Sequence, residues 1–411
     1  MKFTVQYTNI IKKNDSLSFE IHGNPEYGLD KTIINCIRRY LLTKINTIGF
    51  KKEKVHIINN NTSLNNEFIK DRISLLFLNI NPTDYTQQYL FQLNKQNKDK
   101  PILKIYSNDF TIHPLKPEIL QKIKEQKTMD YVPEQLKVIE SINNYDLTKT
   151  IPEPEKKQIL KPYVFNKKDY YPILLELKFN NSQNVFQSLE LNCIPSIHNG
   201  DYNANFNNVT CSTYSFKVNE KLANEVFQNN LKIHKIKPDD IEEYKLSFQT
   251  SEYDRYYYRD NFNEPYWYNF IIESQHFYDQ KTLWKQSIQT IQRDLTNIQN
   301  NLQKLETNPK DTKYTITNDE LKVKIQLYED ESVISMIQSH IVQKKLNSKS
   351  LVSFCGYKKE HPLKDNIHIN LLVQPNQYST TELIHYIINF MNQSILEIID
   401  ILRVLDTTEQ L

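Results

Sequence analysis

The sequence is short of glycine, which accounts for only 5 of its 411 residues, whereas an average chain contains about 7% glycine. Loops that wrap phosphate groups or present a nucleophile on a sharp turn need glycines at fixed spacings. The patterns G-x-G-x-x-G, G-x-x-x-x-G-K-[ST] and G-x-S-x-G do not occur. These absences argue against dinucleotide-dependent enzymes, P-loop nucleotide hydrolases and α/β-hydrolases.

Cysteine is also scarce, and Cys36, Cys193, Cys211 and Cys355 lie far apart, without any C-x-x-C pair. Zinc ribbons need paired cysteines, and disulfide scaffolds need a dense cysteine framework in a short chain. The 10 histidines form no H-E-x-x-H motif. We therefore expect reduced thiols in a reducing compartment, no bound metal and no cofactor.

Long apolar runs and an excess of one charge are missing as well. No stretch approaches the roughly 20 apolar residues of a membrane helix, and the first residues lack the apolar region of a signal peptide. With 51 basic and 49 acidic residues the net charge is +2, too small for bulk electrostatics alone to hold the chain on nucleic acid. The sequence thus predicts an intracellular protein without a membrane segment.

Hydrophobic periodicity predicts an alternation of strands and helices. Strands are expected at residues 2–7, 17–21, 54–58, 102–106, 172–179, 188–194, 210–218, 267–273, 321–327 and 367–373. Helices are expected at 31–44, 65–76, 282–305, 332–346 and 380–405, with Asp30 capping the first and Ser332 the fourth. The apolar residues between 288 and 305 are spaced alternately by three and four, a heptad seam that needs a partner helix. Strand, helix, strands and long helix recur in residues 314–411, which indicates an architectural duplication.

Five segments resemble motifs of one protein family. Four of them lie in residues 1–274, and the fifth lies near the C-terminus of the sequence. Residues 35–42 (NCIRRYLL), 61–76 (NTSLNNEFIKDRISLL), 106–110 (YSNDF) and 270–274 (FIIES) resemble motifs of the RNA polymerase alpha-type subunits. This group comprises the bacterial alpha subunit, archaeal D and L, and the third and eleventh eukaryotic subunits. Residues 354–363 (FCGYKKEHPL) resemble the F-A-G-Y-K-x-x-H-P-L motif of the smaller partner, archaeal L and its eukaryotic counterpart. One chain thus resembles both halves of a heterodimer, in a fusion similar to those of large cytoplasmic DNA viruses.

The resemblance implies an α+β fold in which two alpha-type dimerisation units, each a sheet with helices, pair as an internal pseudo-dimer. Residues 1–80 and 264–306 are expected to form the first unit and residues 314–411 the second, joined by a linker at 307–313. Residues 81–263 are expected to form a β-rich insert domain, with 116–162 as a partly flexible insertion. Two such units would bury their uncovered helix faces in a four-helix layer. The residues expected in this layer are Ile33, Ile37, Leu41, Ile288, Ile291, Leu295, Ile298, Leu302, Ile337, Ile341, Ile387, Met391 and Ile395.

The function implied by the resemblance is that of a non-catalytic assembly subunit of a DNA-directed RNA polymerase. It would bind the two largest subunits and a small zinc-binding subunit, and would meet DNA and RNA only through the complex, in the host cytoplasm and the virion. No D-x-D-G-D motif is present to hold catalytic magnesium. The expected large-subunit interface is Arg38, Arg39, Glu67 and Arg72, and the expected family turn is Gly356, Tyr357, His361 and Pro362. The insert holds only two cysteines, too few for the metal module of some family members.

Alternatives remain open at this point. Arg38 and Arg39 also fit a solvated helix face, and the 288–305 seam also fits a homomeric coiled coil. The Tyr- and Arg-rich tract 253–268 fits a single-stranded nucleic-acid-binding protein. Cys355 and His361 could serve as the nucleophile and base of a hydrolase. Neither of these two functions accounts for the duplicated architecture.

Overall fold

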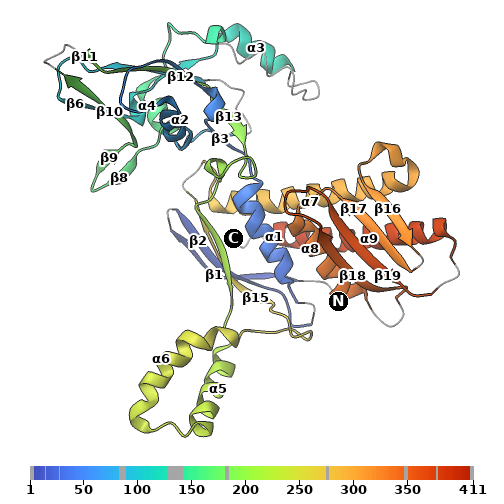
Figure 1. The fold of residues 1–411 in the computed structure, drawn as a ribbon. Coiled ribbons are helices and arrows are strands. Elements are labelled where there is room, and N and C mark those ends of the chain that lie inside the picture. Colours follow the sequence, from blue (N-terminus) through green and yellow to red (C-terminus); the bar gives the residue numbers. More distant parts are fainter. Residues whose placement is uncertain are drawn as a thin grey trace. The chain divides into compact units, whose positions relative to one another are not determined.

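The chain has an α+β fold, and its internal contacts divide it into two compact units (Figure 1). The computed structural model describes residues 4–13, 15–26, 28–82, 89–126, 142–180, 185–274, 277–319, 321–346, 350–375 and 378–407. Unit 1 comprises Met1–Lys44, Val209–Ser274 and Asp279–Leu411. Unit 2 comprises Ile45–Asn208 and Gln275–Tyr278. Among the described helices, none is both long and apolar enough to cross a membrane.

Unit 1 contains two four-stranded antiparallel sheets with the same strand order. The first has the order β1 (Gln6–Lys13), β2 (Ser16–His22), β15 (Trp267–Glu273), β14 (Cys211–Phe216). The second has the order β16 (Thr315–Asp319), β17 (Lys322–Leu327), β19 (Ile367–Val373), β18 (Val352–Lys359). Each sheet therefore joins its first strand to its second, its second to its fourth and its fourth to its third.

The helices of unit 1 follow the strands in the same places in both halves. A short helix follows the second strand of each sheet and a 28-residue helix follows the fourth. The helices of the first half are α1 (Lys31–Thr43) and α7 (Gln280–Thr307), and those of the second are α8 (Glu331–His340), continued by a π-helical turn (Ile341–Lys345), and α9 (Thr380–Thr407). A helical hairpin, α5 (Glu220–Ile233) and α6 (Ile241–Ser251), lies between β14 and β15 in the chain.

The first sheet of unit 1 is held to α7 by aromatic packing. Alternation along β15 sends Tyr268, Phe270 and Ile272 to the buried face. Phe270 stacks on Phe19 of β2 with ring centroids 5.6 Å apart and meets Trp284 of α7 edge-on at 5.0 Å. Aromatic pairs at these separations are favourable beyond the area they bury. The alternation seen in the sequence is thus the pattern that orients this sheet.

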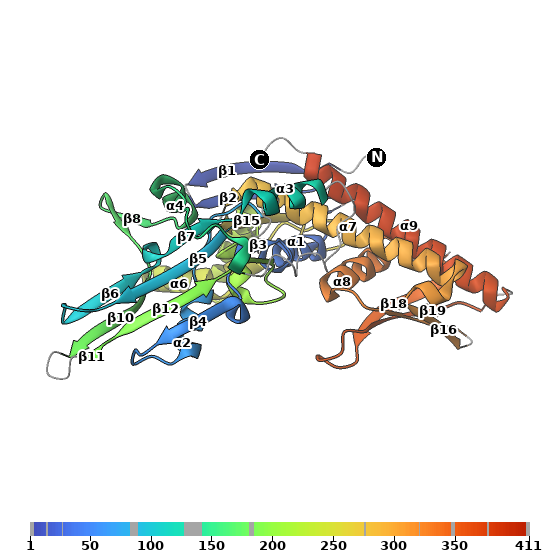
Figure 2. The ribbon, with the colours of Figure 1, turned by 90° about the horizontal axis from the view of Figure 1, so that it is seen from above.

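The four helices of unit 1 pack on one another, α7 along α9, α1 against α7 and α8, and α8 against α9 (Figure 2). The polar contacts between Gln299 Nε2 and the Asn392 carbonyl, 3.0 Å, and between Gln289 Nε2 and Asp406 Oδ2, 3.4 Å, make α7 and α9 antiparallel. Every residue expected in a helix layer is at most 3% exposed. The heptad seam of α7 therefore has a partner helix within its own chain.

Unit 2 is rich in β-structure. Its larger sheets have the orders β4 (Val55–Asn60), β12 (Ser188–Cys193), β5 (Tyr89–Gln96), β7 (Thr111–Pro114) and β11 (Val185–Phe186), β10 (Ile173–Asn180), β6 (Ile102–Tyr106). Two-stranded sheets pair β3 (Thr47–Gly49) with β13 (Ser196–His198) and β8 (Tyr163–Phe165) with β9 (Lys168–Tyr170). The helices are α2 (Asn66–Ser74), α3 (Pro117–Gln126) and α4 (Glu153–Ile159). Asn208 ties the end of this segment to its start, because its Nδ2 donates to the carbonyls of Ile45, 2.8 Å, and Asn46, 3.1 Å.

The unit boundaries differ from the expected ones at 80 and 264. Residues 45–80 belong to unit 2 because β4 pairs with β12, and residues 209–263 belong to unit 1 because β14 pairs with β15. Residues 314–411 group with the first half in unit 1 and do not stand apart. The expected insertion at 116–162 includes the helices α3 and α4, while its residues 127–141 lie outside the described residues.

Helix starts are partly as expected. Asp30 caps α1, as expected, and Asn65 caps α2. Ser332 does not cap α8, because that helix begins two residues earlier: Asp330 is its N-cap and accepts from the Ser332 backbone N–H. A carboxylate at this position is at least as good a cap as a hydroxyl.

We predict that Leu295→Ala destabilises unit 1 by about 2–5 kcal/mol, the usual loss for a fully buried leucine. The measurement is guanidinium unfolding followed by tryptophan fluorescence. Both tryptophans, Trp267 and Trp284, lie in unit 1 and so report on that unit. Asn297→Ala, at an exposed position of the same helix, is the control and is expected to change stability by less than about 0.5 kcal/mol. Equal effects of the two substitutions would contradict the packing of the seam.

Candidate assembly site

The two short helices of unit 1 start in the same way. Asp30 Oδ1 accepts a hydrogen bond from the backbone N–H of Thr32 at 2.8 Å, and Asp330 Oδ1 accepts one from Ser332 at 2.8 Å. Such a carboxylate satisfies a free N–H group of the first turn and interacts favourably with the helix dipole. Both helices thus begin with the local pattern D-x-[ST].

Each capping aspartate also contacts the last turn of the opposite helix. Ser339 Oγ, near the end of α8, donates to Asp30 Oδ2 at 2.7 Å. Lys44, the C-cap residue of α1, places Nζ 3.1 Å from Asp330 Oδ2. The helices α1 and α8 are therefore antiparallel, and each places its N-cap against the C-terminal end of the other. Such an exchange of roles is characteristic of a two-fold interface.

The contact between Lys44 and Asp330 is a partly buried ion pair, with side chains 21% and 19% exposed. Burial opposes the ionisation of Asp330, but hydrogen bonds from Ser332 and the Lys44 ammonium outweigh it, and the pKa of Asp330 lies below its ordinary value. Two further acids, Glu329 and Asp294, accept hydrogen bonds from the hydroxyls of Tyr314 and Tyr40. Burial keeps the pKa of Glu329 above its usual range. This end of the α1–α8 pair is therefore acidic, and Asp330, Glu329 and Asp294 each have a hydrogen-bond or ion-pair partner.

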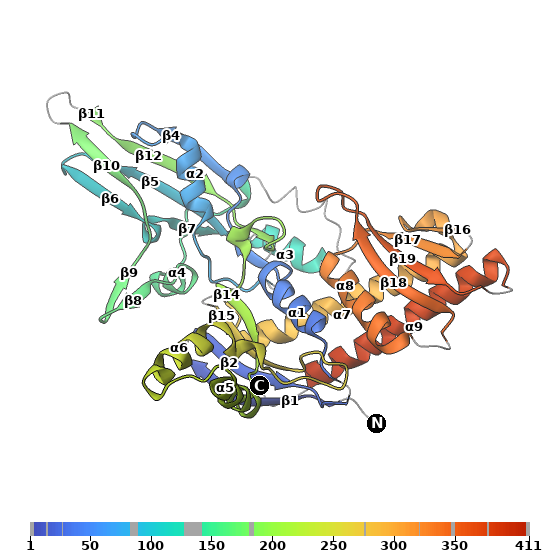
Figure 3. The same ribbon diagram turned by 60° about the horizontal axis from the view of Figure 1, so that its bottom comes forward.

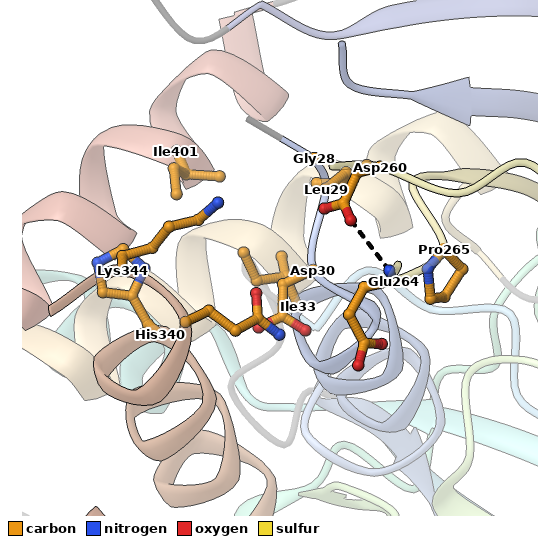
Figure 4. A pocket seen from close by; sticks show the side chains of 11 residues that line it. Gly28, Leu29, Asp30, Ile33, Asp260, Glu264, Pro265, His340, Lys344 and Ile401 are labelled. Atoms are coloured by element: carbon orange, nitrogen blue, oxygen red, sulfur yellow. Dashed lines mark hydrogen bonds between the residues drawn. The ribbon is translucent and has the colours of Figure 1, made fainter. Parts of the chain in front are cut away.

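The other end of the α1–α8 pair contains a small cavity (Figure 4). The start of α1, the loop at 260–265, the π-helical turn and α9 line it, with Asp30, Glu264, His340 and Lys344 among the lining residues. Its volume is about 30 Å³, the space of about one water molecule in the liquid. Burial lowers the pKa of His340, although its hydrogen bond to Glu397 at 3.0 Å partly offsets this. The cavity is too small for an organic substrate.

Neither expected interface residue of α1 forms an ion pair with a described carboxylate. Arg39 is exposed, and no described carboxylate lies within ion-pair distance of its guanidinium group. Arg38 is half-buried and donates from Nε to Asn35 Oδ1 at 3.0 Å. A guanidinium without an internal carboxylate can form a bidentate contact with a carboxylate of another protein. The geometry is compatible with an interface role for this pair.

Glu67 and Arg72 lie on α2 of unit 2, so the four expected interface residues fall into two pairs in different units. Arg72 Nη1 donates to the Leu174 carbonyl at 2.7 Å, which joins α2 to β10. Glu67 is exposed and pairs with Lys70 on the same helix at 3.3 Å. Arg72 therefore has a structural contact, whereas the Glu67 pair is a surface interaction of little energetic weight.

The expected family turn is only partly a turn. Gly356 and Tyr357 lie inside β18, while His361 and Pro362 follow the end of that strand. A Cβ atom at Gly356 would lie 2.9 Å from Cζ of Phe354, so the phenyl ring covers the glycine. Residues two apart in a strand share a face, and an aromatic ring over a strand glycine shields its backbone from water. This packing explains the F-x-G spacing.

Most aromatic rings of the tract 253–268 pack against other side chains of unit 1. Tyr256 stacks on Phe248 with centroids 5.8 Å apart, Tyr257 lies 4.8 Å from Phe216, and Tyr258 stacks on Trp267 at 4.8 Å. The Arg259 guanidinium covers the Tyr257 ring at 4.5 Å. Few ring faces of this tract are therefore free to stack on bases.

Cys355 is a poor nucleophile. It is 2% exposed in β18, and burial raises the pKa of its thiol to about 12, so the thiol stays protonated at neutral pH. His361 is exposed and accepts a hydrogen bond from the Leu363 N–H through Nδ1 at 3.1 Å. The pair therefore lacks the features of an activated thiolate.

In the part of the chain that the structure describes, no group of three or more His, Cys, Asp or Glu residues could hold a metal ion. The cysteines are unpaired, and Cys211 belongs to unit 1 and not to the expected insert with Cys193. Comparisons with known protein families and with curated proteins give no match.

The reciprocal contacts of Asp30 and Asp330 were missed by the sequence analysis. The available signal was the D-x-[ST] pattern at residues 30–32 and 330–332, at the start of two helices with the same place in a repeated order. The partners Lys44 and Ser339 carry no signal in the sequence, because only tertiary packing brings them to the caps.

We predict that Asp330→Asn lowers the stability of unit 1 at pH 7 by about 1 kcal/mol, because asparagine retains the cap but loses the charge opposite Lys44. The pKa of Asp330 is lowered in the folded chain, so its contribution is complete above the unfolded value of about 3.9 and is lost as the pH falls below that. The measurement is tryptophan-monitored unfolding at neutral and acid pH.

The stability difference between the natural chain and Asp330→Asn should shrink at acid pH. Asp400→Asn is the control, because Asp400 is 69% exposed and forms a surface ion pair with Arg403 at 2.9 Å. A difference that stays the same at both pH values would mean that the Lys44 ion pair does not stabilise the fold.

Proposed function

We propose that the chain is a fused alpha-type assembly subunit of a multisubunit DNA-directed RNA polymerase, a scaffold without catalytic residues of its own. In this proposal the two halves of unit 1 pair as an internal pseudo-dimer. The observation that supports it most is the repeated architecture of unit 1, in which equivalent helices exchange equivalent contacts.

The repeat extends over every element of the second half. In chain order β16, β17, α8, β18, β19 and α9 correspond to β1, β2, α1, β14, β15 and α7, and both sheets have the same strand order. Unit 2 lies in the chain between α1 and β14. In the second half, only residues 341–351 separate α8 from β18 in the chain, and the first five of them form the π-helical turn. An insert in one half only is what a larger and a smaller alpha-type subunit would give.

Fusion has a physical advantage for such a pair. Two half-units with uncovered helix faces would need to meet at a high concentration, whereas a short linker gives an effective concentration of roughly millimolar. The connection at 307–313 includes a single 3₁₀ turn, Pro309–Asp311. A heterodimer interface thus becomes an intramolecular layer whose formation does not depend on protein concentration.

Assembly in this proposal uses the surface of α1. Arg38 and Arg39 would contact a large subunit, and the same platform would bind both of the two largest subunits. A small zinc-binding subunit would dock on the chain, and DNA and RNA would be reached only through the complex. Because the fusion resembles those of large cytoplasmic DNA viruses, the proposal also places the chain in the host cytoplasm and in the virion.

We predict that replacing both Arg38 and Arg39 with Ala weakens co-purification of the two largest subunits with a tagged chain by about tenfold or more, because bidentate arginine contacts at an interface are each worth about 2 kcal/mol. The measurement is quantitative mass spectrometry of the purified complex together with an RNA-synthesis assay. Arg293→Ala is the matched control, because Arg293 is 69% exposed on α7 of the same unit. Undiminished recovery with the double variant would refute the α1 interface.

We also predict that the halves stay together after the linker is cut. A protease recognition sequence placed within 307–313 should be cleaved in the folded chain, and the two fragments should then co-elute, because the buried helix layer holds them. One copy of the cleaved chain per pair of large subunits is the expected stoichiometry. Two copies per enzyme would instead indicate that halves of different chains pair with each other.

A further inference from the structure

The hairpin of β8 and β9 in unit 2 is a two-stranded ribbon that pairs with no other strand among the described residues (Figures 1 and 3). Two residues connect its strands, Asn166 with φ 48° and Lys167 with φ 61°. Left-handed residues at both central positions define the tight turn that suits the twist of a hairpin. Isolated two-stranded ribbons are marginally stable in water, so contacts outside the hairpin contribute to its stability.

The register of the hairpin sorts its side chains by face. Tyr163 is opposite Tyr170, and Phe165 is opposite Lys168. Successive residues of a strand alternate between faces, and cross-strand partners share a face. One face of the ribbon therefore carries three aromatic rings and one ammonium group, whereas Val164 and Asp169 occupy the opposite face.

The face of the hairpin that carries Val164 and Asp169 contacts another element of unit 2. Asp169 Oδ2 forms an ion pair with Lys157 Nζ of α4, and the two atoms are 2.5 Å apart. This contact uses the single carboxylate of the hairpin and ties the ribbon to a helix of unit 2. The aromatic face remains uncovered by that contact.

The three rings are exposed, by 64% for Tyr163, 54% for Phe165 and 50% for Tyr170. None of them stacks on another ring among the described residues, in contrast to Tyr256, Tyr257 and Tyr258 of the tract 253–268. Three uncovered aromatic side chains on one small surface are unusual for a surface without a binding role. Their faces are available for stacking.

The charge of the hairpin is positive. Lys161, Lys167 and Lys168 are exposed, and none of them has a carboxylate of the described residues within ion-pair distance. The acidic groups nearby already have partners, Asp169 with Lys157 and Glu153 with Lys156 at 3.1 Å. Lys168 therefore lies on the same face as the three rings, and Lys161 and Lys167 lie close to them in the chain; none of the three is paired with a described carboxylate.

We propose that the aromatic face of the β8–β9 hairpin binds single-stranded nucleic acid. Bases would stack on Tyr163, Phe165 and Tyr170 while the lysines contact the phosphates, the combination used by proteins that bind single strands without sequence preference. An apolar groove of a protein fits this face less well, because it would bury the Lys168 ammonium among the rings without a counter-charge. A phosphate supplies that charge.

This inference is independent of the proposed assembly function. It assigns single-strand binding to residues 163–170 and not to the tract 253–268, whose rings are engaged in packing. Stacking and phosphate contacts are shared by DNA and RNA strands, and the experiment separates the two.

The test is fluorescence anisotropy of the full chain with labelled oligo(dT) and oligo(rU) of about 20 nucleotides. Tyr163→Ala, Phe165→Ala and Tyr170→Ala should each weaken binding by about 5- to 100-fold, as loss of a stacked base does. Lys168→Ala should reduce the slope of log affinity against log salt by about one. Binding of one oligonucleotide and not the other would restrict the proposal to DNA or to RNA.

Matched variants separate stacking from structural damage. Tyr163→Phe retains the ring and Val164→Ala changes the opposite face, so both should bind as the natural chain does, with unchanged thermal unfolding. The proposal fails if the chain binds neither oligonucleotide at low salt, or if the three ring variants bind normally. It also fails if only Arg255→Ala and Arg259→Ala abolish binding, which would assign the site to the tract 253–268. If the three ring variants bind both oligonucleotides normally but no longer co-purify with other protein subunits, the hairpin is a protein-docking surface and the proposal fails.

Discussion

The apolar packing of helix α7 along helix α9 is the constraint on which the rest of unit 1 depends. The two helices lie along each other, and each buries a row of apolar side chains. Leu295 and Ile395 have no exposed surface, so separating the halves would return both helix faces to water. Burial of apolar area is the dominant favourable contribution to folding, so opening this interface would cost each half a large part of its stabilisation. The repeated architecture follows from this need for a complementary face.

Polar contacts then define how the two halves meet. Apolar helices can pack in several registers, but the caps Asp30 and Asp330 each require a partner from the far end of the opposite helix. A slip by one turn would leave a partly buried carboxylate without its partner, a penalty of a few kcal/mol. The pair of contacts therefore selects one antiparallel register. In the proposed function this register matters because it fixes where Arg38 and Arg39 lie relative to the second half.

Aromatic residues have two different roles in the chain. In unit 1 the tract 253–268 lies against β14 and the helical hairpin, and its rings pack on Phe216, Phe248 and Trp267. In unit 2 the rings of the β8–β9 hairpin stay exposed because that ribbon joins none of the larger sheets formed by the described strands. Composition and local sequence are similar in the two places, since both mix tyrosine with basic residues. The difference in availability comes from strand pairing.

The sequence by itself determined the local elements and their polarity. Alternation in residues 267–273 and 367–373 defines β15 and β19 with the bounds observed, and the seam at 288–305 identifies the buried side of α7. These are properties of the chain within one element, so periodicity reveals them. Tertiary structure decided which strands join which sheet. For this reason residues 45–80 belong to unit 2 and residues 209–263 to unit 1, in contrast to the division expected from the sequence. It also decided the partners of Asp30 and Asp330 and which tyrosines remain exposed, because pairing between segments hundreds of residues apart depends on the packed chain and leaves no local pattern.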